Sequence, residues 1–400
     1  MADVRPFGAV RPLDSLAGDV IAPPYDVLSE EEARKIAENR RSFVRITRPE
    51  VDLERGTDPH SDDAYLKARE TLEAFQAEGT LVQDEEPNFY FYGQQMGEHR
   101  QVGVIAAASV AEYDDGRIAK HEFTRPDKED DRTHHMGVLG AQVGLVFLAY
   151  RPTEALAQLT AEVTAAPPAW QVTTEDDVVH TLWRAPLDRV EAIREAFAAV
   201  DRLYIADGHH RSAAASRIHA QRGDGASAYF LAGLYPADRL QVMAYNRVVD
   251  DLAGHDAAGF LAAVEGAGFT VEPTASPVPA ERGTVTMYLD GRWYRLTPSA
   301  ALRSDDPVAG LDVAILQDHI LEPLLGITDP RRSSRIRFVG GIHGAPALSA
   351  AVDGGAAVAF HLYPTGLDQL FAVADAGQVM PPKSTWFEPK LREGVVIRAL

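Results

Sequence analysis

The residues best suited to do chemistry are Asp207, Gly208, His209, His210 and Arg211, which follow one another directly. An apolar run precedes them and an alanine-rich stretch follows, which predicts a strand, a tight turn at the glycine and a helix. The first amides of a helix lack partners within the helix, and the positive end of the dipole faces the same place. Guanidinium and imidazole groups add further donors for phosphate. We therefore predict that residues 208–211 bind the phosphates of a ligand.

Asp207 and His210 are also the candidate catalytic residues of this turn. A carboxylate just before a helix either caps it or binds a divalent cation, so Asp207 is a candidate metal ligand as well. A plainer interpretation stays open, in which Asp207 is only an N-cap and both histidines are surface-polar or hydrogen-bonded in the core. Two histidines and an arginine at one strand-to-helix junction favour a functional role.

Lys128 and Arg132 are candidate phosphate ligands from a second segment. They are four residues apart, so on a helix they would share one face. The surrounding run balances both signs of charge, and such runs are usually solvated, which leaves a surface role open.

Candidate substrate contacts come from three other places. Pro23-Pro24-Tyr25-Asp26 predicts a rigid turn, because proline fixes φ, and Asp26 could meet the amino group of an amino-acid substrate. A cation and two hydroxyls follow a proline pair near the C-terminus, and Asn-Arg follows an apolar run near residue 245. The candidates from these places are Asp26, Asn246, Arg247, Lys383, Ser384 and Thr385.

Several of these segments carry a resemblance to known families. Asp207-Gly208-His209-His210-Arg211 resembles the phosphate-binding segment of ParB-like folds and of archaeal free serine kinases. Residues 22–27, 120–132 and 380–385 look like marker segments of the domain-of-unknown-function family ten-fifteen, and the match runs from about residue 5 to the end. The resemblance implies a ParB-like nucleotide-binding core with additional N- and C-terminal elements. It also implies an ATP- or ADP-dependent kinase, working with Mg²⁺, that converts free L-serine into O-phosphoserine.

The same resemblance implies a role for Glu122. In the serine kinases a Pro-His-Glu segment supplies the catalytic base, and here Lys120-His121-Glu122 matches it with lysine in place of proline. Thr124 is then a candidate substrate contact. A positioned carboxylate helps because a serine hydroxyl is a poor nucleophile. The alternative is a ParB-like nucleotide-binding switch, which would use the turn at residues 207–211 without needing Glu122.

The elements that must position these residues alternate between strand-like and helix-like patterns, which predicts a mixed α/β or α+β fold. We expect an N-terminal helical and loop segment over 1–85, a ParB-like catalytic core over 86–250 and an α+β domain over 251–400. The individual elements that we expect are a helix that starts after Ser29, helices over 62–78, 209–221 and 311–325, hairpins over 88–113 and 284–297, and an apolar run over 240–245.

Composition limits the function classes. The chain has 400 residues with 59 acidic and 39 basic side chains, so its formal charge of −20 disfavours a nucleic-acid partner. Without cysteine, any metal must bind through oxygen or imidazole. The N-terminus has no signal-peptide pattern, and no apolar run is long enough for a membrane span, so we expect a cytoplasmic protein. A homodimer is compatible with the sequence, which leaves the oligomeric state open.

Overall fold

The computed structural model describes residues 2–400 and divides into two compact units. Unit 1 contains the described residues up to Leu240 together with Pro389–Leu400, which we name the C-terminal segment. Unit 2 contains Gln241–Glu388. The chain thus leaves unit 1, builds unit 2 and returns. The sequence had led us to expect three consecutive segments, with the last boundary after residue 250 and the C-terminus in the third.

Unit 1 is built on a nine-stranded sheet, counted within residues 2–400, whose path runs β6-β11-β8-β12-β5-β4-β10-β9 with β1 beside β5. Most neighbours are antiparallel, but β6 with β11 and β8 with β12 are parallel. The strands are β1 (Val4–Arg5), β4 (Tyr90–Met96), β5 (His99–Ser109), β6 (Ile118–Ala119), β8 (Val146–Tyr150), β9 (Trp170–Thr173), β10 (Val178–Arg184), β11 (Leu203–Asp207) and β12 (Tyr229–Pro236). The expected hairpin over 88–113 is confirmed as β4 and β5.

Several helices of unit 1 start at a serine or threonine whose hydroxyl accepts a hydrogen bond from a backbone amide. Ser29 forms a capping box with Glu32: the Glu32 amide donates to Ser29 Oγ at 3.3 Å, and the Ser29 amide donates to the Glu32 carboxylate at 2.9 Å. The α-helices are α1 (Ala17–Val20), α2 (Glu30–Ile36), α3 (Val44–Thr47), α4 (Asp62–Ala77), α5 (Val110–Asp114), α6 (Pro126–Leu139), α7 (Glu154–Thr164), α8 (Val190–Ala198) and α9 (His209–Arg222). The mixed α/β prediction is therefore confirmed.

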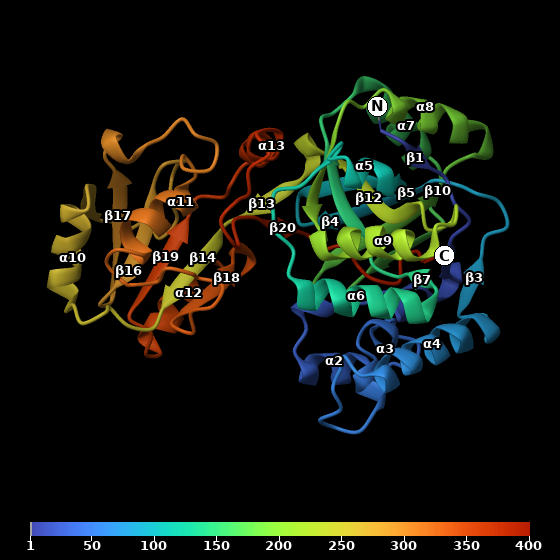
Figure 1. Ribbon diagram of the computed structural model, residues 1–400, viewed down its shortest axis with the longest axis horizontal. Coiled ribbons are helices and arrows are strands. Elements are labelled where there is room, and N and C mark those ends of the chain that lie inside the picture. The colour runs from blue at the N-terminus through green and yellow to red at the C-terminus, as the bar shows by residue number, and fades with distance from the viewer. Residues whose placement is uncertain (1) are drawn as a thin grey trace. The chain divides into compact units, whose positions relative to one another are not determined.

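Helices α6 and α9 lie side by side (Figure 1). Arg217 of α9 links them, because its Nη2 donates to Asp130 Oδ1 of α6 at 2.6 Å. The helices follow β6 and β11, which are neighbouring parallel strands, so both helices begin at the same edge of the sheet. This edge holds most of the residues that the sequence singled out in unit 1.

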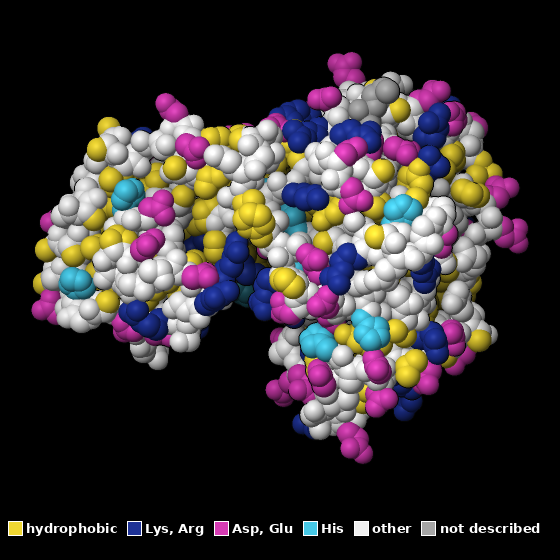
Figure 2. Space-filling view, in the orientation of Figure 1, with side chains coloured by type: hydrophobic (Ala, Val, Ile, Leu, Met, Phe, Trp, Pro, Cys, Tyr) yellow, Lys and Arg dark blue, Asp and Glu magenta, His cyan; other side chains and the backbone are white. Residues whose placement is uncertain are grey.

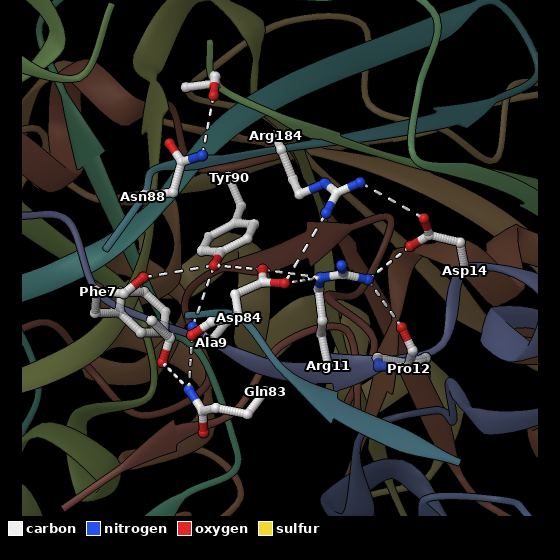
Figure 3. A network of polar contacts seen from close by, with 12 residues as sticks. Phe7, Ala9, Arg11, Pro12, Asp14, Gln83, Asp84, Asn88, Tyr90 and Arg184 are labelled. Carbon is white, nitrogen blue, oxygen red and sulfur yellow. Dashed lines mark hydrogen bonds and ion pairs between the residues drawn. The ribbon is translucent and has the colours of Figure 1, made fainter. Parts of the chain in front are cut away.

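A polar network ties the first residues of the chain to the sheet (Figure 3). Arg11 donates from Nε to Asp84 at 2.9 Å and from Nη1 to Asp14 at 2.6 Å. The Tyr90 hydroxyl donates to Asp84 at 2.8 Å. Arg11 belongs to β2 (Val10–Pro12), which pairs with β3 (Leu81–Gln83), and the Val10 backbone also pairs with Ile397. The network therefore fixes a strand that the C-terminal segment packs against, and a last pair joins β7 (Ala141–Gln142) to β21 (Arg398–Ala399) in the same unit.

Unit 2 holds a six-stranded antiparallel sheet, within the described residues, in the order β15-β17-β16-β19-β14-β18. The predicted hairpin over 284–297 is confirmed, and its turn places Asp290 and Gly291 at φ of 49° and 73°. The elements are β13 (Gln241–Met243), β14 (Tyr245–Val249), α10 (Ala257–Gly266), β15 (Phe269–Pro273), β16 (Val285–Leu289), β17 (Arg292–Pro298), α11 (Asp312–Leu316), a π-helix (Gln317–Leu321), β18 (Ile336–Gly340), α12 (Gly344–Asp353), β19 (Val358–Leu362), α13 (Leu367–Asp375) and β20 (Trp386–Glu388).

One expectation about unit 2 needs correction, and one expected run is divided. The apolar run over 240–245 contributes to two strands, because β13 pairs with β20 while β14 joins the six-stranded sheet. The helix expected over 311–325 becomes a short α-helix and a π-helix that together end at Leu321.

The surface carries charged side chains of both signs, as the composition leads us to expect. On the face of unit 1 that Figure 2 shows, Lys and Arg side chains are interspersed with Asp and Glu side chains. Among residues 2–400, no helix has the length and apolar character needed to cross a membrane.

Candidate functional site

The predicted strand, turn and helix around Gly208 are confirmed. Strand β11 ends at Asp207, Gly208 has a φ of 94°, and α9 begins at His209. A side chain at position 208 would be strained by this φ, and its Cβ would lie 3.3 Å from both Val146 Cα and Arg211 Nε. Glycine is thus required here both by backbone conformation and by the close approach of β8.

Arg211 lies on the first turn of α9 and is held from two sides. Its Nη1 donates to the carbonyl oxygen of Leu145 at 2.5 Å, and its Nη2 donates to Asp207 Oδ2 at 2.9 Å. Its side chain is only 14% exposed, whereas that of Asp207 is 47% exposed. Burial lowers the pKa of Arg211, but nearby acidic groups outweigh it, so the pKa lies above its usual value and the guanidinium stays charged.

Residues from distant parts of the sequence gather around Arg211. The guanidinium carbon of Arg132, on α6, lies 4.3 Å from the centre of the Tyr25 ring, and Asp131 pairs with the same guanidinium at 2.6 Å. Asp26, beside Tyr25, is exposed and interacts electrostatically with Arg211. We name this set the arginine cluster, and it consists of Tyr25, Asp26, Arg132, Asp207, Arg211 and Glu393.

Glu393 is the member that sequence reasoning missed. It belongs to the C-terminal segment, is 3% exposed, and its Oε2 has no hydrogen-bond partner within the described chain. Burial raises its pKa to about 7, although the Thr47 hydroxyl, Arg211 and Arg132 each lower it. Thr47 nevertheless makes no hydrogen bond of good geometry to the carboxylate, since its Oγ1 is also unpartnered among residues 2–400. The signal available in the sequence was a single acidic residue, Glu393, directly before Gly394 and the apolar run Val395-Val396-Ile397.

The two histidines of the turn differ in placement. His209 is buried, and its ring lies perpendicular to that of His121 with centroids 4.6 Å apart. Burial lowers the pKa of His209 well below 6.5, so the ring is neutral, and it faces the interior rather than a ligand as the sequence had suggested. His210 is partly buried, and its Nε2 accepts a hydrogen bond from the Arg125 amide at 3.1 Å. The neutral ring of His210 therefore carries its proton on Nδ1, the only atom from which it can donate.

The segment from Lys120 to Lys128 lies at the same sheet edge. Glu122 is exposed and follows β6, whose parallel neighbour β11 ends at Asp207. The Thr124 hydroxyl donates to the Glu129 carboxylate on the first turn of α6. Lys128 lies one helical turn before Arg132 on α6, as expected, and is partly buried. The sheet thus brings Glu122, Lys128 and the turn to one edge.

The remaining candidate substrate contacts belong to unit 2. They are Asn246, Arg247, Lys383, Ser384 and Thr385. Arg247 is buried and donates to the carbonyl oxygen of Pro382 at 3.1 Å, and burial lowers its pKa to about 9. Lys383 has a φ of 58° and places Nζ 5.5 Å from the centre of the Tyr245 ring. All five residues belong to unit 2, whereas the members of the arginine cluster belong to unit 1.

The sequence profile of a family described as "Protein of unknown function (DUF1015)" matches residues 4–314. The chain belongs to this family. The marker segments 22–27, 120–132 and 207–211 of this DUF1015 protein lie inside the match, whereas 380–385 and Glu393 lie beyond it. No curated protein matches the chain.

Solved structures give only loose likenesses to this DUF1015 protein. "Free serine kinase in complex with AMP" is 13% identical and covers 71% of this chain and 86% of its own, with a TM-score of 0.36. "Free serine kinase (E30A mutant) in complex with ADP" is 12% identical, covers 71% and 87%, and has a TM-score of 0.36. "SbnI with C-terminal truncation" from Staphylococcus aureus is 10% identical, covers 72% and 84%, and has a TM-score of 0.38. Scores this low carry no argument about the site.

Proposed function

We propose that this protein is a nucleotide-dependent phosphotransferase that moves a phosphoryl group from ATP or ADP to the hydroxyl of free L-serine. One observation carries the proposal: the turn at 207–211, the Tyr25-Asp26 turn and Arg132 are far apart in sequence but meet in the arginine cluster. Two guanidiniums beside the start of a helix are well suited to the phosphates of a nucleotide. The resemblance of 207–211 to the phosphate-binding segment of serine kinases supports the same assignment.

Each group has a proposed role. The backbone amides of 208–211, the guanidiniums of Arg211 and Arg132, and Lys128 bind phosphate oxygens, and His210 donates from Nδ1. Asp26, exposed next to the guanidiniums, binds the ammonium group of serine. His209 has no proposed role in ligand binding, because its ring is buried.

Glu122 is the proposed proton acceptor for the serine hydroxyl, and its side chain is exposed to solvent at this edge of the sheet. Thr124, two residues later, is a proposed contact for the same substrate. The five candidates of unit 2 are not needed for this chemistry.

Magnesium fits this set of residues through Asp207. No group of three or more acidic or histidine side chains within residues 2–400 is arranged as a closed metal site. Mg²⁺, however, commonly binds to one or two carboxylates and completes its shell with water and substrate phosphates. Asp207 has a half-exposed side chain at the phosphate-binding turn, so it is the carboxylate that would hold the ion. When bound, the ion would neutralise phosphate charge.

A nucleotide-binding switch is the second candidate. The arginine cluster favours it as much as it favours a kinase, because the phosphate contacts of the cluster do not involve Glu122. The switch would use the same phosphate contacts and would produce no phosphoserine.

The test is to incubate the purified full chain with ATP or ADP, Mg²⁺ and L-serine, and to follow the products by phosphorus NMR. The kinase proposal expects O-phosphoserine. Glu122→Gln should retain ADP binding and lose about 10²- to 10⁴-fold in turnover, the usual contribution of a general base. Glu98→Gln, at an exposed hairpin turn, is the matched control and should keep full turnover. Nucleotide binding without phosphoserine would favour the switch, and absence of nucleotide binding would contradict both.

A further inference from the structure

The C-terminal segment delivers Glu393 to the arginine cluster with a fixed backbone. The Glu393 amide donates to the Ala22 carbonyl at 2.9 Å, and the Ala22 amide donates to the Glu393 carbonyl at 3.1 Å. Gly394 follows with a φ of 77° and packs so closely that a Cβ there would lie 2.6 Å from Phe43 Cγ. The position of the Glu393 side chain is therefore set by the fold and not by a mobile tail.

The carboxylate of Glu393 shares a small buried space with Arg211. A Cβ added to Gly144 would lie 3.4 Å from Arg211 Nη1 and 3.8 Å from Glu393 Oε1, so both groups border the same point. Charged and titratable groups that face Glu393 are Arg211, Arg132, Asp26 and Tyr25, with the Thr47 hydroxyl beside them. Its own neighbour Arg392 turns away and pairs with Asp176 and His180.

This arrangement leaves one carboxylate oxygen without a partner beside two guanidiniums. A buried acceptor without a hydrogen bond costs free energy, and an ionised one costs more. Glu393 Oε2 is such an atom in the described chain. The guanidiniums also pair with Asp207 and Asp131, so their attraction for Glu393 offsets less of this cost once a further anion binds to them.

We propose that Glu393 is an internal counter-anion: together with Asp207 and Asp131 it balances the charge around Arg211 and Arg132 in the free protein, and it takes up a proton when a phosphate group binds to those guanidiniums. The idea rests on the proposed function for the identity of the ligand. The step is a simple exchange, in which the arriving phosphate replaces the carboxylate charge and one proton moves from solvent to a Glu393 oxygen. The C-terminal segment thereby makes phosphate binding dependent on pH.

The size of the effect follows from the titration of Glu393. Burial raises its pKa to about 7, so half of the free protein carries the charge at neutral pH. Binding of a phosphate near pH 7 should then take up about 0.5 proton more in the wild type than in Glu393→Gln. Near pH 8 only about a tenth of the free wild type is protonated at Glu393, so Glu393→Gln should bind about tenfold more tightly than the wild type. Near pH 6 the two should be about equal.

The experiment is calorimetric titration of the full chain in buffers of different ionisation enthalpy, which counts the protons taken up. Two probes are used, ADP and sulfate, because sulfate does not titrate in this range. Glu112→Gln is the matched control: Glu112 is also buried with a pKa raised by burial, but its carboxylate accepts from the Asp3 amide and pairs with Arg117. It should behave as the wild type.

The outcomes separate the two proposals. Equal proton uptake by wild type and Glu393→Gln with ADP would overturn the counter-anion and leave the phosphotransferase intact. Sulfate binding with the expected difference, but no ADP binding, would keep the counter-anion and reject the phosphotransferase. Weaker binding by a Glu393→Gln protein with an unchanged melting temperature would show a different role for the carboxylate, and failure of both probes to bind would overturn both proposals.

Discussion

Replacing Arg211 with lysine is the sharpest perturbation of the arginine cluster. Lysine keeps the positive charge, but a single ammonium group cannot reproduce the planar fork of a guanidinium. In the wild type that fork spans the Leu145 carbonyl at 2.5 Å and Asp207 at 2.9 Å. A lysine at 211 can satisfy one of these groups while the other loses its donor.

The structure sets the magnitude for stability. Leu145 is 4% exposed, so loss of the donor to its carbonyl should cost about 1–3 kcal/mol in the free energy of unfolding. The ion pair with Asp207 adds at most about 1 kcal/mol, because that carboxylate is half exposed and screened by solvent. We expect Arg211→Lys to lower the free energy of unfolding of unit 1 by about 1–3 kcal/mol.

Arg211→Lys should also weaken the binding of ADP. Loss of one charge-assisted hydrogen bond to a phosphate costs about 1.5–3 kcal/mol, which is about 10- to 150-fold in the dissociation constant for ADP. The assays are urea unfolding and calorimetric titration with ADP. Arg217→Lys is the control, since Arg217 lies on the same helix but its pair with Asp130 is 40% and 65% exposed. An Arg211→Lys protein that is folded and binds ADP as tightly as the wild type would refute the assignment of the turn as the phosphate site.

Two further expectations concern the C-terminal segment. Gly394→Ala should lower the free energy of unfolding by about 2–5 kcal/mol, because it adds backbone strain and a clash with Phe43. The control is Gly116→Ala, which has a φ of 82° and open space around it and should lower the free energy of unfolding by only about 1–2 kcal/mol. Similar losses for both variants in urea unfolding would argue against tight packing at position 394. Arg392→Met should cost about 1–3 kcal/mol, because it removes the donor to the buried His180 Nε2 at 3.3 Å. An Arg392→Met protein with an unchanged urea midpoint would show that this bond does not help to hold the segment.

Local signals in the sequence determined much of the fold. Ser29 with Glu32 specifies a helix start by itself, because both hydrogen bonds of a capping box lie within four residues. Asp290-Gly291 specifies a tight hairpin turn, since both positions need a positive φ that few residues tolerate. The strand, the turn at Gly208 and helix α9 were predictable for the same reason. These features depend on neighbours along the chain and therefore on information that the sequence states directly.

Tertiary structure alone decided which of these pieces meet. Nothing local indicates that the Tyr25 ring stacks on Arg132, that the ring of His209 turns inward onto His121, or that Glu393 returns from beyond unit 2 to lie beside Arg211. Such contacts come from burial of apolar surface and from the pairing of strands across the whole chain, and their energies do not depend on separation in sequence. The turn and its residue types were therefore determined by the sequence, whereas the set of charges that surrounds it, and with it the pKa of Glu393, was decided by the fold.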